Sequence, residues 1–194
     1  MLTLPNVTLI CLSNKDFEGH KKAIDKSCEK ILFGDVKMIW DERIKNIDDW
    51  NYKMIFELWR YVWTDYAMII HADGYIINPE LWNPDWLLYD FIGAPWPLPM
   101  DDYSYRDVNG RIVRVGNSVS LRSKKIMKLP HDMQLEWKSY HGNTNEDGFL
   151  CCHNRHLLEQ QGCLFAPLPV AVHFSKEHEI GENVGLKTFA FHSL

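Results

Sequence analysis

Three short apolar runs, separated by two amphipathic stretches, occupy the first part of the chain and constrain its fold most. Val7–Leu12, Val36–Trp40 and Tyr66–Ile70 are rich in aliphatic and β-branched residues, as buried strands are. Asp16–Ile31 and Tyr52–Val62 place their apolar side chains at helical spacing. This strand-helix-strand-helix-strand order predicts an α/β fold with a central, mostly parallel sheet flanked by helices.

The rest of the chain differs in composition and shows less regular apolar spacing. Proline and tryptophan are dense between Ala94 and Met100, which limits regular structure there. Phe33–Asp35 is expected to form a turn, and Asn145–Leu158 to form one helix. With 194 residues, 46% hydrophobic, and no repeat or linker, residues 1–194 are predicted to form one domain, alone or within a longer polypeptide.

Charge and composition exclude several classes of protein. A net charge of -5 argues against a polynucleotide partner, because phosphate binding needs clustered cations. One local group of basic residues is interpreted as a solvated surface: Arg106, Arg111, Arg114, Arg122, Lys124 and Lys125. No apolar stretch reaches the roughly 18 to 20 residues of a transmembrane helix, and the N-terminus does not resemble a signal peptide. Five cysteines without a CxxC pair predict a reducing, cytoplasmic compartment.

The ends of the three strands carry the candidate chemistry, because parallel strands bring their carboxyl ends to one edge of the sheet. Ser13, Asp41 and Asp73 stand at or just beyond these ends. His71 and Asp73 lie two residues apart and would project to the same side of an extended chain. With Asp41 and Glu146-Asp147, and with His192 as a further candidate, they form a carboxylate and imidazole set that suits Mn²⁺ and tolerates Mg²⁺. The alternative is a strand followed by an ordinary Asp-Gly turn.

Other segments also have a functional and a structural interpretation. Gly116, Asn117 and Ser118 could offer donors to ligand hydroxyls, or form a tight turn before a strand. The acids Glu146-Asp147 could supply a general base, or complement the dipole of the helix they open. Trp96 could form a platform for a sugar ring, or fill the core.

Several segments, taken in order, resemble the GT-A-fold glycosyltransferases found in bacterial surface-polysaccharide loci and in some large viruses. The resemblance spans nearly the whole chain. It is carried by His71–Tyr75 with Asn78-Pro79, Tyr89–Trp96, Val115–Lys124, Asn145–Asp147, Phe165–Pro167, Ala171–Ser175 and Phe191-His192.

The resemblance implies a nucleotide site at the strand ends. Leu12, Ser13 and Asp41 would hold the base and ribose, and Asp73 would complete the nucleotide site. The expected donor is a nucleotide-diphosphate sugar, with a uridine diphosphate sugar favoured. The expected acceptor is a hydroxyl of a glycan or glycoprotein.

The resemblance also implies a metal-dependent mechanism. Asp73 matches the last acid of the DxD-type metal motif, His71 replaces the first acid, and His192 matches a C-terminal histidine ligand. The expected ion is Mn²⁺ or Mg²⁺.

The same resemblance assigns the sugar site and the catalytic base. Trp96, Gly116, Asn117 and Ser118 would line the donor-sugar pocket. Asp147, with Glu146 beside it, matches the catalytic base of inverting members. The chain would thus be a hexosyltransferase of glycan biosynthesis that inverts the anomeric centre, in the cytoplasm or, for a viral protein, the host cytoplasm. Two alternatives stay open: a catalytically silent carbohydrate-binding or scaffold domain, and a metal-dependent hydrolase.

Overall fold

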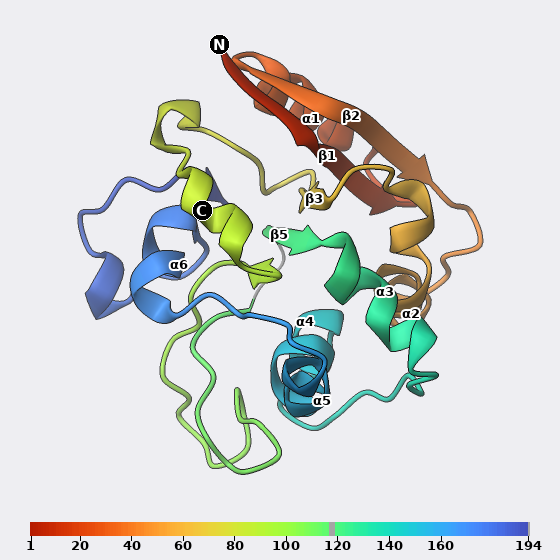
Figure 1. Cartoon of the computed structure of the whole chain (residues 1–194), viewed down its shortest axis with the longest axis vertical. Coiled ribbons are helices and arrows are strands. Elements are labelled where there is room, and N and C mark those ends of the chain that lie inside the picture. The colour runs from red at the N-terminus through yellow and green to blue at the C-terminus, as the bar shows by residue number, and fades with distance from the viewer. Residues whose placement is uncertain (117–118, 194) are drawn as a thin grey trace.

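A five-stranded sheet with helices on both faces forms the centre of the computed structural model, which describes residues 1–116 and 119–193 (Figure 1). The strands are β1 (Leu2–Ser13), β2 (Ile31–Trp40), β3 (Tyr66–Ile69), β4 (Phe91–Ile92), β5 (Ser120–Ser123), β6 (Ser175–Lys176) and β7 (Ala190–Phe191). The α-helices are α1 (Phe17–Cys28), α2 (Ile47–Phe56), α3 (Lys124–Asp132), α4 (Glu146–Gly148), α5 (Arg155–Gln160) and α6 (Leu168–Phe174). Short 3₁₀ helices cover Leu58–Tyr61, Pro79–Leu81, Pro84–Leu88 and Gly181–Asn183, and a π-helix covers Phe149–His153.

The strand order of the main sheet is β2-β1-β3-β5-β4. β1 pairs in parallel with β2 and β3, whereas β5 pairs antiparallel with both β3 and β4. Four strands therefore share one direction and β5 opposes them. The predicted α/β fold with a mostly parallel sheet is confirmed, and the antiparallel β5 makes the sheet mixed.

The prediction of a turn from Phe33 to Asp35 is wrong, because β2 continues through this segment. Leu4 pairs with Phe33, and Thr8 pairs with Asp35. Three residues of β1 therefore face Gly34 alone, and this irregularity absorbs the extra length as a bulge does. Both strands are consequently longer than their apolar runs indicate.

The two faces of the sheet carry separate hydrophobic clusters, as alternation along a strand requires. Leu9 and Cys11 of β1 pack in one cluster with Ala23 of α1. Ile10, on the other face of β1, packs in the second cluster with Met54 of α2. Helices α1 and α2 therefore cover opposite faces of the sheet.

Side-chain caps fix where the first two helices begin. The Asp16 carboxylate accepts a hydrogen bond of 3.1 Å from the Gly19 backbone N–H at the start of α1. The Asn46 side chain accepts one of 2.9 Å from the Asp49 N–H at the start of α2. Such caps satisfy backbone donors that have no partner inside the helix. The second helix accordingly begins before Tyr52, earlier than expected.

The prediction of a single helix from Asn145 to Leu158 is also wrong, because α4, the π-helix and α5 follow one another instead. Asn154 separates the last two. Its backbone N–H and its side-chain amide both donate to the Phe149 carbonyl, at 3.0 and 3.1 Å. An asparagine that bonds to the backbone in this way competes with regular helix.

The C-terminal residues fold back onto the segment that follows β3. Strands β6 and β7 pair in parallel, and the His192 N–H donates to the Lys176 carbonyl at 2.9 Å. The Ser193 N–H donates to the Asp73 carbonyl at 2.9 Å. The tail is thereby held against the end of the central sheet.

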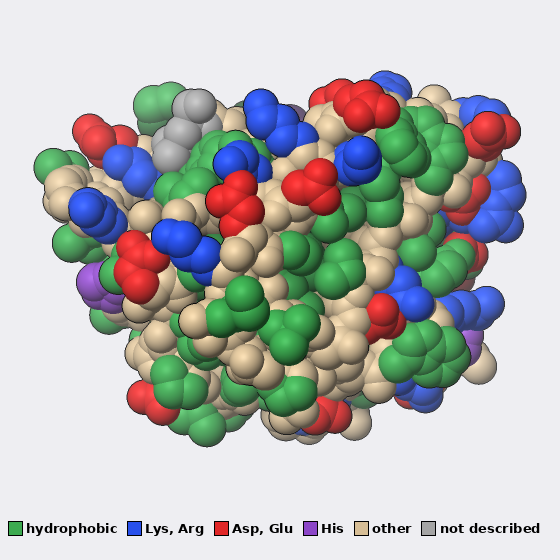
Figure 2. Space-filling view, turned by 90° about the horizontal axis from the view of Figure 1, so that it is seen from above, with side chains coloured by type: hydrophobic (Ala, Val, Ile, Leu, Met, Phe, Trp, Pro, Cys, Tyr) green, Lys and Arg blue, Asp and Glu red, His purple; other side chains and the backbone are tan. Residues whose placement is uncertain are grey.

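The surface is mixed in charge on the face that Figure 2 displays. Lys and Arg side chains are interspersed there with Asp and Glu, and apolar side chains lie between them (Figure 2). Within residues 1–116 and 119–193, no helix is both long enough and apolar enough to span a membrane.

Candidate active site

A cavity of about 250 Å³ lies beyond the carboxyl end of β1. Ser13 lines this cavity, together with Asn14, Lys15, Trp50 and residues 44–47. Leu12 is buried, and its carbonyl accepts a hydrogen bond of 2.9 Å from the Trp50 indole N–H. Leu12 therefore supports the wall of the cavity through Trp50, and Ser13 reaches the cavity itself.

Asp41 directly follows β2, but its carboxylate is engaged within the chain. Its Oδ2 lies 2.8 Å from both the Arg43 guanidinium and the Lys53 ammonium. The hydrogen bond from Arg43, followed by that from Lys53, outweighs the effect of burial and holds the pKa of Asp41 well below its usual range. Asp41 thus fixes the start of the loop that leads to the cavity.

His71 and Asp73 belong to a tight turn after β3. The His71 N–H donates to the Gly74 carbonyl at 2.7 Å, and the Gly74 N–H donates back at 3.3 Å. A side chain at Gly74 would not fit, because its Cβ would lie 2.6 Å from Cδ2 of His192. The glycine therefore lets the C-terminal histidine approach the turn, and the His71 and His192 ring centroids lie 5.2 Å apart.

His192 stands between two carboxylates. Its Nε2 lies 3.3 Å from Asp73 Oδ1, and its Nδ1 lies 3.3 Å from Glu177 Oε2. Burial alone would lower the pKa of His192, but Glu177 and then Asp73 outweigh burial and raise it. Partial burial would raise the pKa of Asp73, yet the hydroxyl of Ser193, which donates to Asp73 Oδ2 at 2.8 Å, and the charge of His192 lower it.

The side chains of this turn offer a carboxylate and an imidazole, donors of the mixed kind that Mn²⁺ accepts. Two neighbouring ligands of an octahedral ion with bonds of about 2.1 Å lie roughly 3 Å apart. The 3.3 Å between His192 Nε2 and Asp73 Oδ1 is close to this spacing, and the Asp73 side chain is 65% exposed. Among the described residues, no three His, Cys, Asp or Glu side chains form a ready-made metal cluster. The described residues of this turn thus offer an ion two ligands, Asp73 and His192, which also form an ion pair with each other.

The neighbours Glu146 and Asp147 face different surroundings. Glu146 is 2% exposed, and its Oε1 lies 2.7 Å from the Arg122 guanidinium, which is fully buried. Its backbone N–H donates to the Asn51 side chain at 3.1 Å. Arg122 extends from β5 over the Phe91 ring, so its interpretation as a solvated surface residue is wrong. Glu146 is therefore held in an internal ion pair.

Asp147 instead lines a cavity of about 220 Å³ whose wall is mostly polar. Burial, followed by the negative charge of Glu146, raises the pKa of Asp147 to about 7. A carboxylate with such a pKa can accept a proton near neutral pH. Of the two candidate bases, Asp147 is the one that reaches a cavity.

Aromatic rings close one side of the Asp147 cavity. Trp96 stacks on Tyr105, with ring centroids 4.8 Å apart and an interplanar angle of 15°, and both line the cavity. Gly116 packs on the Trp96 ring, because a Cβ there would lie 2.1 Å from ring atoms. Trp96 is 4% exposed, so its face is used by Tyr105 and the core. Asn117 and Ser118 lie outside the described residues.

Glu177 connects the two candidate groups. It lines the cavity of Asp147 and, at the same time, contacts Nδ1 of His192. Asp73, His192, Glu177 and Asp147 therefore form one continuous polar line from the end of β3 to the start of α4. Sequence reasoning missed Glu177, because it lies in a polar stretch without a motif.

Sequence reasoning also missed Arg122. The signal for it was available: an arginine between Leu121 and Ser123, inside a predicted strand, is unusual on a sheet with two covered faces. A buried arginine requires a carboxylate partner, and that requirement would have pointed to one of the two neighbouring acids of α4.

Comparisons with known proteins agree with this architecture. The fold is similar to the crystal structure of a glycosyltransferase involved in the glycosylation of the major capsid of PBCV-1, with a TM-score of 0.60 and 10% sequence identity. The alignment covers 96% of this chain and 92% of that one. A search of curated proteins finds no match to this sequence. A family profile matches residues 35–192, from β2 to the histidine of the tail, and the chain therefore belongs to the family described as protein of unknown function (DUF5672).

Proposed function

We propose that this chain is a glycosyltransferase that moves a sugar from a nucleotide-diphosphate donor, with a uridine diphosphate sugar favoured, to a hydroxyl of a glycan or glycoprotein. The similarity of its fold to a viral glycosyltransferase over nearly the whole length supports this assignment. One observation carries it further. The polar line from Asp73 through His192 and Glu177 to Asp147 joins the proposed phosphate-binding end to a carboxylate of raised pKa.

Asp147 is the proposed general base. It would take the proton from the acceptor hydroxyl while that oxygen attacks the anomeric carbon, and the bond from this carbon to the diphosphate oxygen breaks. A direct displacement of this kind inverts the anomeric centre. Proton transfer to a positioned carboxylate contributes about 10²- to 10⁴-fold in rate.

Asp73 and His192 are the proposed ligands of Mn²⁺ or Mg²⁺, and Glu177 is a positioning residue that orients the imidazole. A bound ion would neutralise negative charge on the leaving diphosphate. Carboxylates that hold the second nitrogen of a ligating histidine are common partners of metal sites. Because Ser13 lines the cavity beyond β1, that cavity is the proposed site of the nucleoside.

Calorimetric titration with UDP, in the presence of Mn²⁺ and then of EDTA, tests the metal step. Binding should require the ion and should be lost in Asp73→Ala, while the exposed control Asp25→Asn should bind as the unaltered chain does. An affinity for UDP that EDTA does not change would contradict the metal assignment. A panel of nucleotide sugars in a melting-temperature assay then identifies the donor, because a ligand of the folded state raises the melting temperature.

The second test separates transfer from binding. Asp147→Asn should keep Mn²⁺-dependent UDP binding and lower transfer by about 10²- to 10⁴-fold. Unchanged turnover would place the base elsewhere. Donor consumption that does not depend on added acceptor would favour a hydrolase, and sugar binding without any turnover would favour a silent carbohydrate-binding domain.

A further inference from the structure

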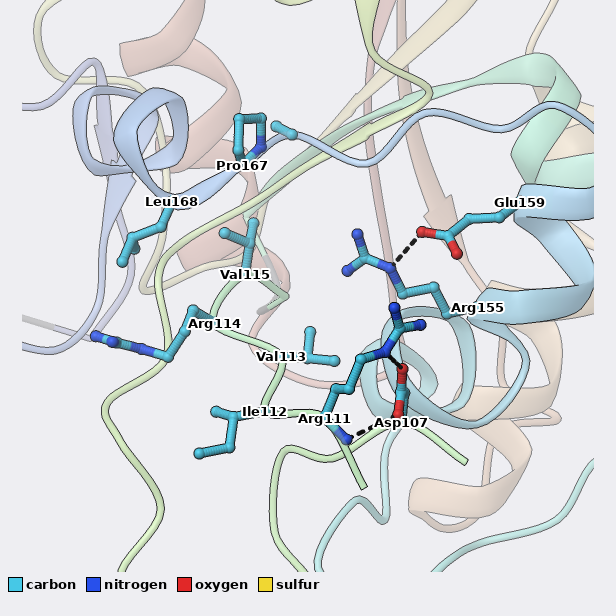
Figure 3. A pocket seen from close by; sticks show the side chains of 11 residues that line it. Asp107, Arg111, Ile112, Val113, Arg114, Val115, Arg155, Glu159, Pro167 and Leu168 are labelled. Atoms are coloured by element: carbon cyan, nitrogen blue, oxygen red, sulfur yellow. Dashed lines mark hydrogen bonds and ion pairs between the residues drawn. The ribbon is translucent and has the colours of Figure 1, made fainter. Parts of the chain in front are cut away.

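A third cavity, of about 270 Å³, lies away from the candidate active site and has its own chemistry. Its wall is built from the segment 111–115, from helix α5 and from the residues that precede α6, as Figure 3 shows. None of the described residues that line it belongs to the polar line of the active site.

Two arginines, Arg155 and Arg111, and their carboxylate partners Glu159 and Asp107 supply the polar side of this cavity. The Arg155 Nε–H donates to Glu159 Oε1 at 2.8 Å, and the Arg111 Nε–H donates to Asp107 Oδ2 at 2.8 Å. Each guanidinium therefore uses its inner nitrogen on a carboxylate of its own segment. In the part of the chain that the structure describes, their terminal nitrogens donate no further hydrogen bond.

The two guanidinium groups differ in their surroundings: the Arg111 side chain is 69% exposed and is held only by its ion pair with Asp107, whereas Arg155 is packed. The Arg155 guanidinium lies over the Phe165 ring at 4.4 Å from its centroid, and its side chain is 23% exposed. Arg155 and Arg111 both line the same cavity, and Figure 3 labels each of them beside its carboxylate partner. A guanidinium has only donors, so the terminal nitrogens of both groups can donate to an acceptor that enters the cavity.

The opposite wall is apolar. Val113, Val115, Pro167 and Leu168 form it, and Arg114 turns away to pair with Glu182 at 3.2 Å (Figure 3). A ligand that satisfies both walls carries an oxyanion at one end and an apolar face at the other. Terminal guanidinium nitrogens match the two oxygens of a carboxylate or phosphate in a bidentate geometry.

We propose that this cavity binds the carboxylate or phosphate group of a small ring-bearing ligand. Arg155 and Arg111 hold the oxyanion, and the apolar wall covers the ring. The inference stands on this cavity alone and does not depend on the proposed transferase activity.

Calorimetric titration of the whole chain with glucuronate, glucose 6-phosphate and glucose tests the proposal and separates the two oxyanions. At least one of the two anions should bind saturably, and glucose should bind at least tenfold more weakly. Arg155→Gln and Arg111→Gln should each weaken anion binding by roughly tenfold or more, since each variant removes charge-assisted hydrogen bonds to the oxyanion. The matched control is Arg60→Gln, which removes an exposed arginine that also lies over a ring, that of Trp59.

Three outcomes would overturn the proposal: neither anion binds, glucose binds as tightly as the anions, or saturating UDP displaces the anion. The last result would place the anion in the donor site. If an arginine variant does not fold, NMR titration of the unaltered chain decides instead. The Nε–H signals of Arg155 and Arg111 should shift with anion concentration, and shifts confined to other arginines would refute the site.

Discussion

Replacing Arg122 by methionine should destabilise the chain severely, because it removes one member of a buried ion pair. The side chains of Arg122 and Glu146 are 0% and 2% exposed, and 2.7 Å separates their charged atoms. Without the guanidinium, Glu146 is a buried carboxylate without its cation, next to Asp147. Breaking such a pair costs roughly 3 to 5 kcal/mol in the free energy of unfolding. At about 2 to 4 °C per kcal/mol, the melting temperature falls by roughly 6 to 20 °C.

Urea unfolding followed by circular dichroism and by tryptophan fluorescence measures this loss. The matched control is Lys128→Met, which breaks the pair of Lys128 with Asp132 on the surface, where the side chains are 44% and 42% exposed. A pair in that environment contributes at most about 1 kcal/mol. The contrast between the two variants isolates the effect of burial from the effect of losing a positive charge.

The double variant Arg122→Met with Glu146→Leu removes both charges and should recover most of the lost stability. Replacing a whole buried pair by apolar side chains is often neutral, since no charge then lacks its partner. The reasoning is refuted if Arg122→Met costs less than about 1 kcal/mol, or if the double variant is less stable than the single one.

Three further results are expected. Gly74→Ala should push the His192 ring away from its carboxylates, because the new Cβ would lie 2.6 Å from Cδ2 of the ring, so the pKa of His192 measured by NMR should fall toward its ordinary value. The rate of transfer should rise with pH through about 7, where Asp147 loses its proton. The contribution of Asp147 to the free energy of unfolding should instead fall as pH rises from about 4 to 7, since the folded state keeps that proton longer. In urea unfolding, Asp147→Asn should remove this dependence of the free energy of unfolding on pH. Asp41→Asn should destabilise the chain at pH 7 by about 1 to 3 kcal/mol, because Lys53 loses a partner. That difference should shrink as pH falls below about 4, because the unfolded chain then takes up a proton at Asp41 while the folded carboxylate, whose pKa is lowered, still lacks it.

The first half of the fold could be predicted from sequence because its signals are local. Apolar runs and helical spacing identify β1, α1, β2 and β3, and these elements exist where expected. Their limits could not be predicted as well, since Gly34 and Pro5 indicate a break where strand pairing instead forms a bulge. The antiparallel direction of β5 depends on its pairing with β3 and β4, which no local pattern contains.

In the candidate site, too, local patterns could be predicted from the sequence and contacts between distant segments could not. The sequence predicts that Asp73, His71 and His192 approach one another, and the structure brings these side chains together. It could not separate the roles of Glu146 and Asp147, because adjacent acids in one helical turn look alike until a buried cation selects one of them. Arg122 makes that selection from β5.

The fold-back of the tail has a consequence for the biosynthesis of the protein. Ser193 and Asp73, which share a hydrogen bond, are 120 positions apart. At a translation rate of about 5 to 20 residues per second, the turn after β3 would wait roughly 6 to 24 s for its last partner. Nascent chains and products of early termination would lack the imidazole and hydroxyl that face Asp73, so assembly of this centre is confined to polypeptides synthesised through residue 193.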